Sequence, residues 1–127
     1  EHYSSGDIYF IQRGYAAHGI DGAYAEDYCY LLSRALFSDP VAYAKALARS
    51  TADDEAVQTL IMGGTAYGAD YYPADCETAV SALDAAINAN ALTAEETGWA
   101  KLLRYYLANP NDGYYADYPK TPAELEN

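Results

Sequence analysis

Basic residues are scarce in this sequence. Its 127 residues include seven lysines and arginines against nineteen aspartates and glutamates, which gives a formal net charge of -12. A nucleic-acid-binding surface needs clustered basic side chains to neutralise phosphates, so this composition excludes nucleic acid as a partner. No apolar run approaches the roughly 20 residues that cross a bilayer, and we expect no membrane insertion. The acidic balance instead suits solubility, a cation or a basic protein partner.

Histidine and cysteine are rare as well, with two residues of each. His2 and His18 are too few for a His-rich zinc site. We find no cofactor motif either, so we predict neither a metal nor a cofactor. Cys29 and His18 form the only conceivable nucleophile–base pair, and the sequence marks out no third residue to orient the histidine. We therefore assign no catalytic residue.

Cys29 and Cys76 are predicted to form a disulfide. The chain begins at Glu1 without a methionine, which we interpret as the start of a processed protein. A cysteine pair in an extracytoplasmic protein is usually oxidised. Closing the long interval between the two residues would stabilise the fold by roughly 4 kcal/mol. We accordingly expect a secreted or cell-envelope protein, and two buried, reduced thiols are the alternative.

Phenylalanine, tryptophan, valine and isoleucine are scarce, whereas alanine and tyrosine are abundant. Two phenylalanines and one tryptophan stand against fifteen tyrosines. Alanine is the strongest helix former, so a chain rich in alanine and poor in β-branched residues favours close-packed helices over a sheet. Tyrosine carries a hydroxyl that needs water or a partner, which places it at core edges and on contact surfaces. We expect an all-α protein that presents part of its tyrosine to a partner.

Hydrophobic periodicity predicts a single all-helical domain over residues 1–127, built of six helices. The clearest start signals are Asp39 before Pro40 and a capping box from Thr93 to Glu96. Most acidic residues fall at helix starts and most basic residues fall in middles or later turns, as the helix dipole favours. The expected helices occupy about residues 7–17, 21–37, 40–48, 51–64, 75–87 and 93–107.

Proline spacing indicates a repeated unit. Pro40, Pro73 and Pro110 recur at intervals of roughly 35 residues, which is typical of helical-repeat proteins. The segment 35–40 resembles the end of a tetratricopeptide repeat, and the stretch 31–47 is similar to a HEAT-type hairpin. The resemblance covers about a third of the chain and implies three antiparallel hairpins in a helical-repeat-like array. A compact six-helix bundle is the alternative.

The last segment, residues 110–127, has a different character. It is rich in tyrosine and proline, and its residues 111–113 have the composition of a turn. The pattern from Thr121 to Glu124 is typical of a new helix start. We interpret the segment as a short closing turn or as the start of a further element.

Two groups of tyrosines are the candidate binding residues. One group falls between the fourth and fifth predicted helices, and the other falls at and after the end of the sixth. Loops after even-numbered helices share one edge in a stack of hairpins, so the two groups could form one surface. Exposed tyrosine offers a large, rigid contact area at low entropy cost. The alternative is that these rings only cover helix ends. The residues are Tyr67, Tyr71 and Tyr72, and then Tyr105, Tyr114, Tyr115 and Tyr118.

Other polar patterns have ordinary structural interpretations. Adjacent acids such as Glu95 and Glu96 fall at helix starts, where they act as caps. Residues 109–117 offer oxygen ligands around a tight turn, which would suit calcium, but they lack the EF-hand spacing. Gly63 and Gly64 have neither a preceding strand nor a following lysine, so they predict a helix end and not a phosphate loop.

These observations favour a non-enzymatic, extracytoplasmic protein-binding module. It would use the tyrosine-rich loops and an acidic surface, as an inhibitor or immunity-type protein does when it occupies a basic partner. Two alternatives remain open. One is a carbohydrate- or cell-wall-binding domain, since tyrosine also stacks on sugar rings. The other is a small enzyme that uses two carboxylates across a cleft.

Overall fold

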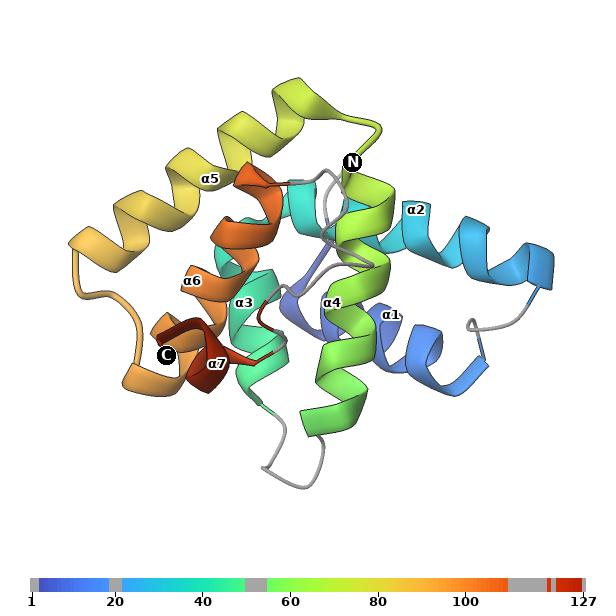
Figure 1. Ribbon diagram of the computed structural model, residues 1–127, viewed down its shortest axis with the longest axis horizontal. Coiled ribbons are helices and arrows are strands. Elements are labelled where there is room, and N and C mark those ends of the chain that lie inside the picture. Colours follow the sequence, from blue (N-terminus) through green and yellow to red (C-terminus); the bar gives the residue numbers. More distant parts are fainter. Residues whose placement is uncertain (1–2, 19–21, 50–54, 110–118, 120, 127) are drawn as a thin grey trace.

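The protein is all-helical, as predicted. The computed structural model describes residues 3–18, 22–49, 55–109, 119 and 121–126, and within these ranges it contains helices and no strand. α5 lies along one side of the molecule, α1 and α2 extend at the other, and α3, α4 and α6 run between them (Figure 1). The helices are α1 (Ser5–His18), α2 (Gly22–Ser38), α3 (Pro40–Ala48), α4 (Glu55–Ala69), α5 (Pro73–Asn88), α6 (Ala94–Ala108) and α7 (Pro122–Glu126).

The predicted helix starts at α3 and α6 are confirmed. The Asp39 carboxylate accepts a hydrogen bond from the backbone N–H of Ala42 at 3.0 Å, and Pro40 occupies the first turn of α3. At α6 the Thr93 hydroxyl accepts from the N–H of Glu96 at 3.1 Å, and the Glu96 carboxylate accepts from the N–H of Thr93 at 3.0 Å. Each cap satisfies backbone donors that a helix start leaves without intrahelical partners.

The start of α5 differs by about half a turn from the prediction. The helix begins at Pro73, with Tyr72 at the cap position, because proline fits the first helical turn. Its other end is a Schellman motif. Asn90 has a φ of 56°, and the N–H of Ala91 donates to the carbonyl of Ala86 at 3.2 Å.

The predicted end of α4 at Gly63 and Gly64 is wrong, because the helix continues to Ala69. The reason is close packing. A Cβ atom added at Gly64 would lie 2.7 Å from the Tyr15 ring. A Cβ atom at Gly68 would overlap the Cys29 carbonyl group, 2.7 Å from its carbon. Glycine at these positions lets α4 approach α1 and α2 more closely than any side chain would allow.

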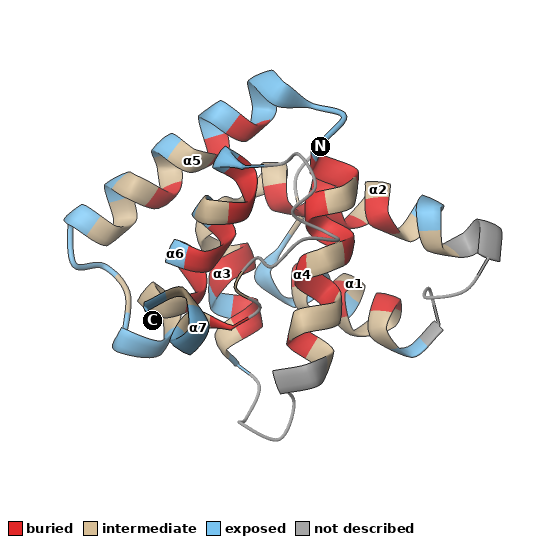
Figure 2. Cartoon of the chain, in the orientation of Figure 1, coloured by how far each residue is buried: buried red, intermediate tan, exposed pale blue. Residues whose placement is uncertain are grey.

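Helices distant in sequence pack against one another. α2 packs most extensively against α4, α5 against α6 and α3 against α6, while α1 lies against α2 and α3. This arrangement is compatible with a small helical bundle or with an array of hairpins. Figure 2 shows that the buried residues line the inward faces of the helices. The largest fully buried side chains are Ile8, Leu32, Leu36, Tyr43, Leu47, Ile61, Met62, Leu83, Leu102 and Leu103.

Polar groups inside the core connect three of the helices. The hydroxyl of Tyr43 on α3 forms a hydrogen bond with Thr65 on α4, and Thr65 also donates to the carbonyl of Ile61 at 2.8 Å. The Gln12 amide on α1 donates to the Tyr43 carbonyl at 3.1 Å. The Gln58 amide on α4 donates to the Leu47 carbonyl. Buried polar groups need such partners, and these bonds fix α3 against its neighbours.

Candidate aromatic contact surface

Five aromatic side chains gather where α4 passes into α5 alongside α2. We call this set the aromatic face: Tyr30, Phe37, Tyr67, Tyr71 and Tyr72. Tyr30 and Phe37 lie seven residues apart on α2, so they project from one side of that helix. Tyr67 belongs to the last turn of α4, and the other two tyrosines follow that helix. Three segments therefore contribute to one surface.

The rings of the aromatic face pack edge to face. The Tyr71 ring lies 5.3 Å from Tyr30 and 6.0 Å from Tyr67, with interplanar angles of 64° in both pairs. Tyr72 and Phe37 are 5.9 Å apart at 76°. Such geometry is the preferred arrangement of aromatic pairs. The contacts give each of these rings a defined orientation.

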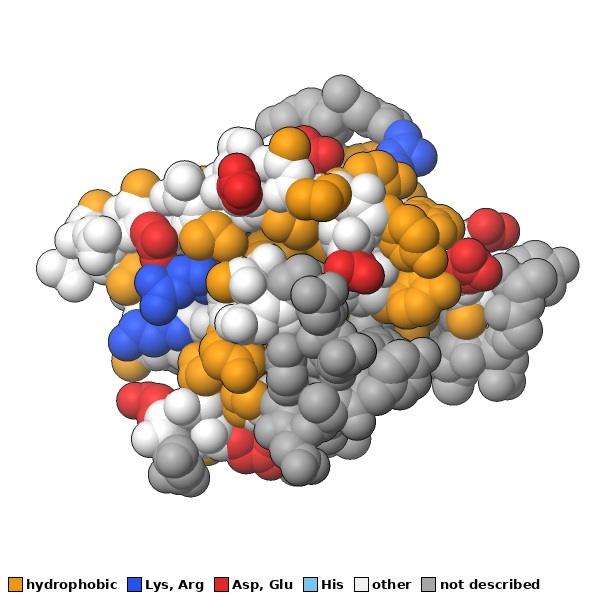
Figure 3. Space-filling model, turned by 45° about the horizontal axis from the view of Figure 1, so that its top comes forward, with side chains coloured by type: hydrophobic (Ala, Val, Ile, Leu, Met, Phe, Trp, Pro, Cys, Tyr) orange, Lys and Arg blue, Asp and Glu red, His pale blue; other side chains and the backbone are white. Residues whose placement is uncertain are grey.

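Two rings of the aromatic face are open to solvent. Tyr71 is 55% exposed and Tyr72 is 36% exposed. Their neighbours Tyr30, Phe37 and Tyr67 are half-buried and support them from below. Figure 3 shows hydrophobic side chains gathered on the upper side of the molecule, with acidic and basic side chains on the border of this area. Charges of both signs therefore flank the apolar area.

Tyr30 is held in its neutral form. Burial raises the pKa of Tyr30 above its ordinary value, and the neighbouring Tyr71 and Glu26 raise it further. The Tyr30 hydroxyl donates to the Glu26 carboxylate at 3.4 Å. A neutral phenol ring has a weakly negative face and a hydroxyl that can donate or accept a hydrogen bond.

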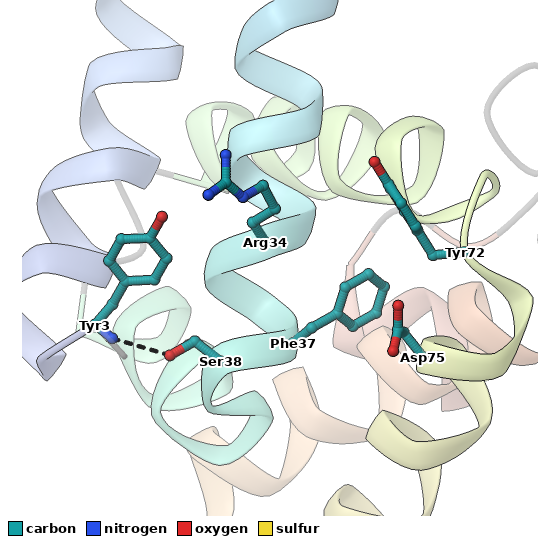
Figure 4. A pocket seen from close by; sticks show the side chains of 6 residues that line it. All are labelled: Tyr3, Arg34, Phe37, Ser38, Tyr72 and Asp75. Carbon is teal, nitrogen blue, oxygen red and sulfur yellow. Dashed lines mark hydrogen bonds between the residues drawn. The ribbon is translucent and has the colours of Figure 1, made fainter. Parts of the chain in front are cut away.

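A hollow of about 390 Å³ opens at the Phe37 end of the aromatic face. Its lining residues are Tyr3, Arg34, Phe37, Ser38, Tyr72 and Asp75. Figure 4 shows the side chains of Asp75 and Tyr72 beside Phe37, with Tyr3 on the opposite side. The N–H of Tyr3 donates to the Ser38 hydroxyl at 3.0 Å, which fixes the start of the chain against the end of α2.

Only part of the predicted tyrosine surface can be compared with the structure. The Tyr67 and Tyr71 rings pack together and Tyr72 packs on Phe37, but Tyr67 lies in the last turn of α4 and not in the predicted loop. Tyr114, Tyr115 and Tyr118 lie outside the described residues. Tyr105 is half-buried on α6, with its ring 6.4 Å from the Tyr106 ring. A single surface formed by both groups therefore stays a prediction.

Sequence reasoning missed the contribution of α2 and the N-terminal segment. Tyr30, Arg34 and Phe37 follow one another at intervals of four and three residues. This spacing places them on one helix face, next to the buried positions Leu32 and Leu36. A second apolar stripe beside the core stripe was the signal that could have found them. No local signal pointed to Tyr3, whose position depends on tertiary packing.

The predicted disulfide is wrong, because both cysteines are unpaired and buried. The Cys29 thiol lies 4.0 Å from the Tyr15 hydroxyl, to which it donates. The Cys76 thiol donates to the Ala69 carbonyl at 3.3 Å. Each thiol thus has its own partner, and the helix contact around Gly68 is made by the backbone of Cys29 and not by its sulfur. The expectation of an extracytoplasmic location loses the support of a disulfide.

Burial also makes both thiols poor nucleophiles. It raises the pKa of Cys29, although the hydrogen bond with Tyr15 opposes the shift. It raises the pKa of Cys76 to about 11, and the carboxylates of Asp75 and Asp70 add to the effect. A thiol must ionise to attack or to bind a metal. The side chain of His18, the other member of the conceivable pair, lies outside the described residues.

Two other hollows open on the described part of the surface. One of about 460 Å³ between α5 and the ends of α4 and α6 is lined by Asp70, Glu77 and Cys76, together with apolar side chains. Both of its carboxylates are exposed. Among the described residues, no group of three or more histidine, cysteine or acidic side chains could hold a metal ion. The candidate calcium turn lies outside the described residues apart from Asn109.

A third hollow lies between α1 and α2, beside the 77% exposed ring of Phe10. Next to Phe10, the Tyr9 ring carries the guanidinium groups of Arg13 and Arg49 at 5.0 and 4.0 Å from its centroid. Phe10 has no ring contact comparable with those that hold Tyr71 among the contacts of the described residues. The aromatic face is therefore the better-ordered candidate.

No protein-family model matches this chain, and no curated protein or solved structure is significantly similar to it. None of the helices in the described ranges is long and apolar enough to cross a bilayer.

Proposed function

We propose that this protein is a non-enzymatic binding module that takes a protein partner on its aromatic face. The observation that carries the proposal is the state of Tyr71. Its ring is 55% exposed and is nevertheless held by edge contacts with Tyr30 and Tyr67. Leaving an aromatic ring exposed does not stabilise the fold. A ring that is exposed and also held in one orientation presents apolar area that a partner can cover.

The physical advantage of this surface is preorganisation. A tyrosine has few rotatable bonds, and rings that already pack on one another lose little further freedom when a partner covers them. Tyrosine is also among the residues that contribute most to interface affinity. Burying Tyr71 and Tyr72 would therefore contribute strongly to affinity with little loss of side-chain conformational entropy.

Charge favours a basic partner. The chain carries a net charge of -12, and the exposed Asp70 and Asp75 lie directly before Tyr71 and shortly after Tyr72 in the sequence. Complementary charge around an apolar centre speeds association and selects against acidic competitors. An inhibitor or immunity-type protein that covers a basic surface has these properties.

Site-specific crosslinking tests the proposal. Tyr71 is replaced by the photoreactive p-benzoylphenylalanine, and the full chain is irradiated in the cell of origin. Ala85, an exposed residue in the last turn of α5, is replaced in the same way as a control. We expect a discrete crosslinked protein from position 71 and none from position 85. The same pattern of crosslinks from both positions, or none from position 71, would overturn the proposal.

The exposed ring of Tyr71 favours one second candidate, a carbohydrate- or cell-wall-binding role, because sugar rings stack on exposed aromatic faces. A glycan array with the purified chain separates the two. Binding that disappears in Tyr71→Ala would support the carbohydrate role. Binding that persists in this variant would count against a role for the aromatic face in sugar recognition.

A further inference from the structure

The hollow at the end of the aromatic face has walls of three aromatic rings from separate segments. Tyr3 precedes α1, Phe37 lies in the last turn of α2, and Tyr72 precedes α5. The Phe37 and Tyr72 rings meet at 76°, so they form a corner and not a flat platform. The volume of about 390 Å³ falls within the range of about 300–1,000 Å³ that small groups occupy in binding sites.

Rings arranged around a space attract cations. The face of each ring is negative, and a lysine or arginine head within about 6 Å of a ring centroid gains free energy from it. The long apolar stem of such a side chain also packs favourably against aromatic carbon. An aromatic corner is therefore suited to a long side chain that ends in a positive charge.

The hollow offers a cation one carboxylate. The Asp75 carboxylate lines the hollow beside Phe37 and Tyr72 (Figure 4). Burial raises the pKa of the nearby Cys76 thiol, and the carboxylates of Asp75 and Asp70 raise it further, as negative charges close to a thiol do. The net charge of the whole chain is also negative.

Arg34 also lines the hollow, where it projects from α2 between Tyr3 and Tyr72 in the view of Figure 4. Its guanidinium group places a positive charge in the same hollow as the Asp75 carboxylate, so the two side chains act in opposite directions on a charged ligand. A cationic ligand would gain from Asp75 and lose from Arg34, whereas an anionic ligand would do the reverse.

We infer that this hollow receives a lysine or arginine side chain of the partner, with the stem against Phe37, Tyr72 and Tyr3 and the charged head at the Asp75 carboxylate. The inference rests on the proposed function, because the hollow adjoins the aromatic face and would be covered by the same partner. The hollow would thereby add selectivity for a positively charged side chain, which the uncharged rings of Tyr71 and Tyr30 do not provide.

The test is a titration of the isotope-labelled full chain with blocked amino acids, followed by NMR. The cationic probes are N-acetyl-lysine-N-methylamide and its arginine counterpart. The anionic probes are N-acetyl-aspartate-N-methylamide and inorganic phosphate. We expect the cationic probes to shift resonances of Tyr3, Phe37 and Tyr72 and to saturate at about 1–50 mM, since a single side chain makes few contacts.

Three variants sharpen the result. Asp75→Asn is expected to weaken lysine binding at least about threefold, and Arg34→Gln to strengthen it, because each removes one charge from the hollow. Glu95→Gln at the start of α6 is the control, since it makes the same change in net charge at an exposed site on another helix. It should leave the affinity unchanged. Phe37→Leu should weaken binding while the spectrum of the core is retained.

Several results would overturn the inference. Shifts by the anionic probes that grow in Asp75→Asn, an equal loss in Asp75→Asn and Glu95→Gln, or no shift by the cationic probes would each do so. The titration reads the hollow alone, whereas crosslinking from position 71 reads the aromatic face. If position 71 crosslinks to a partner and the chain does not bind the lysine probe, the proposed function stands and the proposed binding of a lysine or arginine side chain in the hollow is rejected.

Discussion

α4 has a closely packed inner contact and an open outer contact, and tyrosine takes part in both. On the inner side, the Tyr15 ring of α1 lies against Gly64 and the backbone of Cys29 on α2 lies against Gly68, with no room for a Cβ atom at either glycine. On the outer side, the exposed Tyr71 meets Tyr30 of α2 and Tyr67 of α4. Glycine allows the close packing of the inner side, whereas tyrosine forms the solvent-exposed outer side.

The difference also separates two uses of tyrosine. Each inner hydroxyl has a protein partner: Tyr43 pairs with Thr65, Tyr15 accepts from Cys29, and Tyr106 donates to the carbonyl of Pro119 at 2.8 Å. These rings are buried core residues. The rings of Tyr71 and Tyr72 reach solvent. A high tyrosine content therefore does not by itself measure a binding surface, because a part of it builds the interior.

The largest effect is expected on the inner side, from Gly68→Ala. The new methyl group would overlap the Cys29 carbonyl, so α2 and α4 must separate. We expect the free energy of unfolding to fall by about 3 kcal/mol or more, as for severe overpacking, in urea titrations. Gly14→Ala is the control, because its methyl group would meet the Tyr28 hydroxyl at an ordinary 3.5 Å. That variant should gain about 0.5–1 kcal/mol. Equal stabilities of the two variants would contradict the close packing.

A smaller effect is expected from removing single hydroxyls on the two sides. Tyr43→Phe takes away the buried partner of Thr65 and should cost about 1–2 kcal/mol. Tyr71→Phe removes a hydroxyl at the surface and should change the stability by less than about 0.5 kcal/mol. Chemical denaturation of both variants with the wild type measures the difference. If Tyr71→Phe cost as much as Tyr43→Phe, the outer rings would be structural.

Alkaline stability tests the unpaired state of Cys76. The folded chain holds its proton up to a pKa of about 11, whereas the unfolded thiol ionises near 9.0. The contribution of this group is therefore complete below pH 9 and is lost as the pH rises toward 11. We expect Cys76→Ala to lose less stability than the wild type across this window, measured by urea unfolding. A chain two hydrogens lighter by intact mass, with no thiol alkylated after unfolding, would instead show the disulfide.

Removing the two outer rings together is also expected to have only a small effect on stability. Tyr71→Ser with Tyr72→Ser removes the two exposed members of the aromatic face. Since both rings already contact water, the melting temperature should fall by no more than about 2–4 °C, which corresponds to under about 1 kcal/mol. Differential scanning calorimetry measures the shift. A fall as large as that of Tyr43→Phe would indicate that the aromatic face is needed to hold α2 on α4.

Local signals in the sequence predicted the helices well and their mutual packing less well. Asp39 with Pro40 and Thr93 with Glu96 specify helix starts through bonds within four residues, so they can be read without the fold. Gly64 has two opposite local meanings, a helix end or a close approach, and only the position of Tyr15 decides between them. Sequence neighbours cannot supply that information.

The candidate site was predictable for the same reason only in part. Tyr67, Tyr71 and Tyr72 are close in sequence and fell into one group by inspection. Tyr30 and Phe37 join them because α2 packs on α4, which is a tertiary contact. The disulfide prediction was wrong for the same reason. The composition shows that two cysteines exist, but only the tertiary structure shows that each thiol lies against a different neighbour.

The most direct test of the account is the affinity of Tyr71→Ser/Tyr72→Ser for the partner captured by crosslinking, measured by calorimetry on samples whose melting temperatures are known. The account predicts that affinity falls at least tenfold, or about 1.4 kcal/mol, while the variant remains as well folded as the melting experiment requires. Unchanged affinity, or a loss of binding that only accompanies a loss of folding, would contradict the claim that these rings are held at the surface for a partner.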